Sequence, residues 1–100
     1  MLIHTEEERE IDQNWVFKTT ISFPNGLIQK ITTTLPFYAY TSWCPSGCFS
    51  PSKVAEAALL LAYKIKPSLL NQNTLNLTLI RHYEKCADSM IKDKLITLNP

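Results

Sequence analysis

Two pairs of residues in this chain have the chemistry and spacing of zinc ligands. Cys44 and Cys48 flank a Pro-Ser-Gly turn, and His82 lies four residues before Cys86. Structural zinc sites use thiolate and imidazole ligands, usually paired about two to five residues apart. A tight turn would aim the first two sulfurs the same way, and residues four apart on a helix project to one side. These four residues therefore predict a candidate zinc site, and a zinc-stapled small domain that contacts nucleic acid is an alternative function for the chain.

The same residues suggest a second chemistry, a thiol nucleophile. Cys48 precedes a predicted helix start at Ser50, where free backbone amides would stabilise a thiolate, and His82 would act as its base. Cys44 and Cys48 lack the Cys-x-x-Cys spacing of redox pairs. A turn and an apolar helix face also explain both pairs, because free cysteine is among the most buried residue types. We therefore expect no catalytic residue and no cofactor, with zinc and then a thiol enzyme as the alternatives.

Carboxylates are concentrated at the start of the sequence. Residues 1–12 contain five acidic side chains and one arginine, whereas the whole chain has a net charge of +1. A short acidic run is usually a solvated surface, and it can also attract a basic protein surface. We expect an acidic N-terminal arm that frays from the domain. Its candidate contacts for a protein partner are Glu6, Glu7, Glu8 and Glu10.

The elements that would position these groups begin with a β-hairpin. Residues 14–23 alternate aromatic or β-branched side chains with more polar ones, the pattern of a half-buried strand. Asn25-Gly26 predicts a tight turn because both residues tolerate positive φ. A second strand is expected over residues 27–35, and a short third strand over residues 37–40.

Five aromatic side chains lie between residues 37 and 49, the densest such region in the chain. Trp and Tyr are common at protein interfaces because they bury a large area at low entropic cost. Residues 41–50 have the composition of a loop, so Tyr40, Trp43 and Phe49 are candidate contacts for a protein partner. Packing within the core is the alternative explanation for the same rings.

Two helices are expected in the second half of the chain. Ser50-Pro51 is a typical helix start, and apolar residues then repeat at helical spacing, which predicts a helix over residues 51–66. A second apolar stripe predicts a helix that covers at least residues 80–95. Residues 74–79 fit either the beginning of that helix or a separate strand.

These elements predict one α+β domain over residues 1–100. We expect an N-terminal antiparallel β-hairpin or three-stranded sheet that packs against one or two C-terminal α-helices. The near-neutral charge disfavours direct binding of nucleic acid, which needs clustered basic residues. No apolar stretch approaches the ~20 residues of a membrane span, and an odd number of cysteines fits free thiols in a reducing cytoplasm.

The composition and the absence of a catalytic motif favour a cytoplasmic, non-enzymatic module that binds a larger protein or protein complex. Small inhibitors or accessory proteins of the phage and plasmid type share this profile, and they act by occupying a surface. An open edge of the small sheet would also permit homodimerisation by strand pairing.

Overall fold

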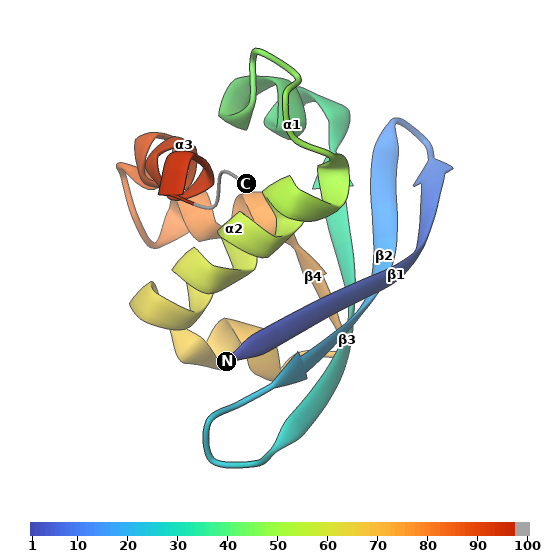
Figure 1. The fold of residues 1–100 in the computed structure, drawn as a ribbon, viewed down its shortest axis with the longest axis vertical. Helices are drawn as coiled ribbons and strands as arrows, with labels where there is room; N and C mark the ends of the chain where they lie inside the picture. Colours follow the sequence, from blue (N-terminus) through green and yellow to red (C-terminus); the bar gives the residue numbers. More distant parts are fainter. Residues whose placement is uncertain (98–100) are drawn as a thin grey trace.

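The computed structural model describes residues 1–97 and shows a four-stranded sheet with helices packed on it (Figure 1). The fold class is α+β, as the sequence predicts. Within the described residues, no helix combines the length and the apolar composition needed to cross a membrane. The elements in chain order are β1 (Leu2–Ile11), β2 (Asn14–Ser22), β3 (Ile28–Pro36), α1 (Phe37–Trp43), α2 (Pro51–Ile65), the 3-10 helix η1 (Pro67–Asn71), β4 (Thr74–Asn76), the 3-10 helix η2 (Leu77–His82) and α3 (Ala87–Thr97).

The strands lie side by side in their chain order, β1-β2-β3-β4. β1 pairs antiparallel with β2, and β2 pairs antiparallel with β3. β4 pairs parallel with β3, so the chain must cross over between them, and the crossover contains α1, α2 and η1. The helices gather on one face of the sheet and leave its opposite face uncovered, which we call the outer face (Figure 1).

The predicted hairpin is confirmed. Phe17, Thr19 and Ile21 are buried, while Lys18 between them is exposed, as the alternating sequence requires. Gly26 closes the turn with φ of +89°, a conformation that glycine adopts without strain. The side chains that point inward from β2 and β3 therefore form the inner face of the sheet, against which α2 packs.

The predicted helix over residues 51–66 is also confirmed, as α2. The Ser50 hydroxyl accepts a hydrogen bond from the Lys53 amide at 3.3 Å, which caps the first turn. Four of the buried positions of α2 are alanines, and small side chains allow the helix to approach the sheet closely. The completely buried residues Val54 and Leu59 fill the space between α2 and its neighbours.

The segment expected to be a frayed acidic arm is instead β1. It pairs with β2 from Leu2 to Ile11, with a β-bulge between Glu6 and Arg9. Ile3 and Thr5 point inward opposite Ile21 and Thr19, and the packing of Ile3 against the core outweighs the local charge. The acidic residues of this segment therefore belong to a strand.

Two expected elements have a different form. Residues 37–40, expected to be a strand, begin α1, because Pro36 ends β3 and the buried residues Ala39 and Trp43 are spaced for a helix. The helix expected over residues 80–95 is interrupted, because η2 ends at His82 and α3 begins at Ala87. The ambiguous residues 74–79 divide between β4 and η2. The Asn76 side chain accepts from the Thr78 amide at 3.0 Å and starts η2.

One buried polar contact lies inside the sheet. The hydroxyls of Thr19 and Thr33 are 2.9 Å apart, and both residues are almost completely buried. Each hydroxyl is the other's partner, so neither is left without a hydrogen bond in the core. This side-chain hydrogen bond joins β2 to β3 within the core.

Replacing one of these threonines should therefore cost more than replacing both. We expect Thr33→Val to lower the free energy of unfolding by about 1–3 kcal/mol, because the Thr19 hydroxyl loses its buried partner. The double variant Thr19→Val/Thr33→Val should recover much of that loss, since valine has the same shape. Urea unfolding of the single and double variants measures both values. A double variant as unstable as the sum of the two single variants would contradict this explanation.

Candidate functional site

The four candidate zinc ligands do not come together. Cys44 is buried, whereas Cys48, His82 and Cys86 are exposed. His82 ends η2 and Cys86 precedes α3, so they do not share one helix as the spacing suggested. Among residues 1–97, no group of three or more histidine, cysteine or acidic side chains could hold a metal ion. The structure gives no support to a zinc site.

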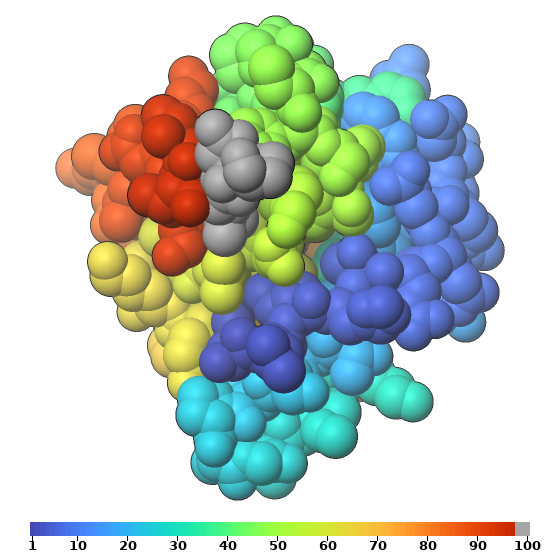
Figure 2. All heavy atoms as spheres, viewed as in Figure 1, coloured from blue at the N-terminus to red at the C-terminus, as the bar shows by residue number. Residues whose placement is uncertain are grey.

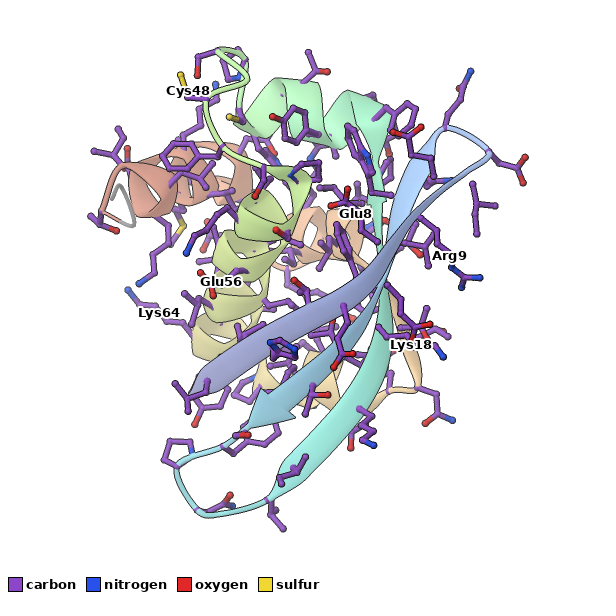
Figure 3. The ribbon with its side chains drawn as sticks, turned by 45° about the vertical axis from the view of Figure 1, so that its right-hand side comes forward. Glu8, Arg9, Lys18, Cys48, Glu56 and Lys64 are labelled. Carbon is purple, nitrogen blue, oxygen red and sulfur yellow. The ribbon has the colours of Figure 1, made fainter. Side chains whose placement is uncertain are left out.

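The pair expected for thiol catalysis is also not assembled. Cys48 lies in the loop between α1 and α2, at the end of the molecule drawn uppermost in Figure 3. The backbone N–H of Cys48 donates a hydrogen bond to the Ser46 hydroxyl at 3.3 Å. No hydrogen bond joins Cys48 to His82 within the described part of the chain. The structure therefore gives no support to Cys48 and His82 as a nucleophile and its base.

The aromatic residues expected to form a binding loop are largely part of the interior. Trp43 is only 1% exposed, so its assignment as a partner contact is wrong. Tyr40 is half-buried, stacks edge-on against Trp15 with ring centroids 4.9 Å apart, and donates its hydroxyl to the Phe49 carbonyl. Phe49 is half-buried and packs against the core. The alternative explanation, core and loop packing, fits these three rings.

Tyr40 is a structural hydrogen-bond donor. Burial is the main cause that raises its pKa, and the nearby thiols of Cys44 and Cys48 raise it further. A tyrosine hydroxyl is protonated at neutral pH, and the raised pKa extends that protonated range toward alkaline pH, so the hydroxyl can donate its hydrogen bond to Phe49. This bond closes the loop that carries both cysteines.

Trp43 and two charged residues form a cluster that joins α1, η2 and α3. The Trp43 indole donates to Asp88 Oδ1 at 2.6 Å, and Arg81 Nε donates to the same oxygen at 2.8 Å. Burial alone would raise the pKa of Asp88. The hydrogen bonds from Trp43 and Arg81 outweigh it, together with the positive charges of Arg81 and Lys92, so the pKa is lowered. Both carboxylate oxygens of Asp88 and the Trp43 indole N–H have partners within this cluster, which indicates a structural role.

The acidic candidates form the only predicted group that the fold displays openly. Glu6, Glu7, Glu8 and Glu10 are exposed on β1. Glu7 lies 3.2 Å from the Lys18 ammonium and Glu6 lies 3.3 Å from the His4 ring. Neither Glu8 nor Glu10 has a cation within 4.0 Å in residues 1–97. Two carboxylates of this strand are therefore available to a positively charged partner.

The bulge divides these side chains between the two faces of the sheet. Glu7 has φ of +51°, and the pairing shifts between Glu6 and Arg9. Figure 3 shows Glu8 and Arg9 on opposite sides of β1, with Arg9 on the same side as Lys18. The exposed carboxylates at this end of β1 therefore face away from the basic side chains of the outer face.

β1 has a second feature that the sequence alone did not reveal, a free backbone edge. It is the outermost strand of the sheet and ten residues long. Between residues 1 and 97, no backbone hydrogen bond joins β1 to any element except β2. Figure 2 shows the strand running across the visible surface with no other described segment in front of it. The opposite edge strand, β4, has only three residues.

A free strand edge can bind another extended chain. Its unpaired N–H and C=O groups form hydrogen bonds with an added strand, and side chains along the edge select the sequence. Ile3 and Thr5, two β-branched residues that share one face of an extended chain, were the sequence signal for this strand. The dense charge that follows obscured it.

The accessibility of the cysteines gives a direct test of the zinc question. We expect Cys48 and Cys86 to react rapidly with a soluble thiol reagent in the folded protein, and Cys44 to react only on unfolding. One equivalent of zinc should leave the two fast reactions unchanged. The Cys44→Ser variant should still show two fast thiols. Protection of Cys48 and Cys86 together by zinc would contradict the arrangement in this structure.

The Asp88 cluster predicts a pH-dependent contribution to stability. Because the folded-state pKa is lowered, the contribution is present above the usual pKa of aspartate and disappears as pH falls through the folded value. Asp88→Asn should therefore be less stable than the parent protein at pH 7, and the difference should shrink as the pH falls below about 4. Urea unfolding at several pH values measures this.

The matched control for Asp88 is Asp93→Asn on the same helix. Within residues 1–97, Asp93 takes part in no ion pair and no side-chain hydrogen bond. This variant should show little pH-dependent loss of stability. An equal loss in both variants would mean that general charge and not the cluster is responsible.

The geometry leaves one surface among the predicted candidates, the free edge of β1 with its carboxylates. Comparison of the chain with protein-family models, with curated proteins and with solved structures gave no match. The physical properties of this edge are therefore the basis for a function.

Proposed function

We propose that this protein is a non-enzymatic protein-binding module whose binding element is the free edge of β1. In this proposal it acts as an inhibitor or accessory protein by occupying a surface of a larger protein or complex. The observation that carries the proposal is a ten-residue outer strand that bears exposed carboxylates and, among residues 1–97, has no backbone partner on one side.

The backbone of the edge supplies affinity. An added strand would satisfy the N–H and C=O groups that now face solvent, and it would extend a sheet that is already ordered by its packing against α2. Because β1 is held by β2 along its length, little of its own freedom would be lost on binding.

The carboxylates supply selectivity. Exposed charges contribute mainly to the rate of encounter and to the rejection of wrong partners. Glu8 and Glu10 would attract a basic surface and repel an acidic one. They also protect the edge against aggregation, because charged side chains and bulges on an edge strand discourage unspecific pairing.

Two other carboxylates of β1, those of Glu6 and Glu7, disfavour the homodimer that the sequence suggested. Antiparallel pairing of two copies of β1 over their full length would place Glu6 of one copy opposite Glu7 of the other, twice. Like charges directly opposite each other destabilise a strand pair. The proposal is therefore binding to a different protein.

The test compares capture of a partner by two matched triple variants. Glu6→Gln/Glu8→Gln/Glu10→Gln neutralises the edge, and Glu56→Gln/Glu84→Gln/Asp93→Asn makes the same change in net charge on the helical side. Each protein is immobilised and exposed to extract from its host, and captured proteins are quantified by mass spectrometry at two salt concentrations.

A specific partner should be captured about 3- to 10-fold less by the edge variant, as expected for the loss of several exposed charge contacts. The helical-side variant should capture it as well as the parent protein does. Higher salt should weaken capture by the parent protein, because salt screens exposed charges. Equal capture by all three proteins, or no specific capture at all, would contradict the proposal.

A further inference from the structure

We infer that the partner of β1 is an extended segment of another protein that is apolar at one end and basic at the other. This inference rests on the proposed function and names the chemistry of the segment. It comes from the two unlike ends of the same strand. The end near Leu2 borders an exposed apolar surface, and the end near Glu10 carries the free carboxylates.

The apolar end is a row of side chains across three strands. Leu2 pairs with Ser22, and Ser22 pairs with Ile28, so these residues lie side by side on the outer face. Leu2 is 75% exposed, Ile28 is 65% exposed, and the neighbouring Leu27 is also 65% exposed. Leu27 precedes β3 and lines a hollow with Tyr63 and Pro67 on the helical side. We call the two outer-face residues, Leu2 and Ile28, the apolar row.

The apolar row differs from ordinary scattered exposure. Single exposed apolar residues are common, whereas a contiguous group at one place marks an interaction surface. Three of the seven large, exposed hydrophobic residues in the described chain belong to this one end of the sheet. The outer-face residues that follow on β2 and β3, among them Lys18, Thr20 and Lys30, are polar, and the next apolar ones, Val16 and Ile11, lie at the far end of the face. The apolar row is therefore confined to one end of the outer face.

The acidic end lies further along the same edge. Leu2 and Glu8 are six residues apart, and a strand rises by about 3.3 Å per residue, so the two ends are about 20 Å apart. An extended segment of about seven to nine residues, added beside β1, would reach from the apolar row to Glu8 and Glu10.

The bulge specifies which side of the segment carries each kind of side chain. Leu2 lies on the outer face, because its neighbour Ile3 packs into the core. Glu8 lies on the opposite side from Arg9 and Lys18 (Figure 3). A basic residue of the segment would meet Arg9 on the outer face, where Glu7 already pairs with Lys18, and the free carboxylate of Glu8 on the other side. The segment therefore presents its apolar and basic residues on opposite faces.

The first experiment selects the segment without assuming its sequence. A displayed library of random ten-residue peptides is selected on the folded protein and on two edge variants. Selection on the parent protein should enrich peptides with Lys or Arg toward one end and apolar residues toward the other. Leu2→Thr/Ile28→Thr should lose the apolar preference alone, and Glu8→Gln/Glu10→Gln should lose the basic preference alone. All four positions are exposed, so the variants should remain folded.

The second experiment tests strand addition itself. A selected peptide is synthesised with N-methyl groups on alternate residues, in both possible phases. Only one edge of an added strand forms hydrogen bonds with β1, so one phase should lose binding at least about tenfold and the other should retain it. Binding through side chains alone would not distinguish the two phases.

The outcomes separate this inference from the proposed function. The inference would be overturned if the selected peptides did not carry their basic residues toward one end, or if both methylation phases had equal effects. Capture of a partner by the edge would in that case still support the proposed function. A dimer of the parent protein that dissociates in Leu2→Thr/Ile28→Thr would overturn it in favour of a second copy. Selection of no peptide would also overturn it. Loss of edge-dependent capture from extract is the separate result that would overturn the function.

Discussion

The register between β1 and β2 is the constraint on which this account depends. Pairing from Leu2 opposite Ser22 to Ile11 opposite Asn14 directs Ile3 and Thr5 into the core and Leu2 and His4 outward. Because side chains alternate along a strand, a slip of one residue would reverse every one of these directions. Leu2 would then point into the core and Ile3 would be exposed. The burial of Ile3 against the core therefore holds the binding edge in its orientation.

The rest of the fold makes β1 the long edge of the sheet. α2 spans the crossover that carries the chain from β3 to β4, and it covers the inner face with alanine and larger apolar residues. β4 then closes the other side with three residues. Hydrogen bonds from Trp43 and Arg81 to Asp88 join α1, η2 and α3. The helical half thus stabilises the sheet and leaves β1 accessible (Figure 1).

Local signals in the sequence were sufficient for the central elements. Alternation over residues 14–23, the Asn25-Gly26 turn and the Ser50 cap each depend on neighbouring residues, and they predicted the hairpin and α2 correctly. Elements that depend on distant contacts were missed. β1 is a strand because Ile3 packs on a core assembled from residues far along the chain. Trp43 was taken for an exposed ring because its partner, Asp88, lies 45 positions away.

The candidate site shows the same division. The four zinc candidates were chosen by spacing, but spacing predicts proximity only when both pairs lie on the expected elements. The acidic residues were identified correctly as exposed, and their place on a strand edge required the sheet. The apolar row could not be predicted, because Leu2 and Ile28 become neighbours only through Ser22.

Amide hydrogen exchange along β1, followed residue by residue by NMR in the protein without a partner, tests the central claim most directly. In a paired edge strand, amides that point toward β2 are protected and those that point outward are not. The account predicts this alternation from Leu2 to Glu6 and its interruption at the bulge. Rapid exchange at every position would show a frayed arm, and protection at every position would show a covered edge. Either result would contradict the account.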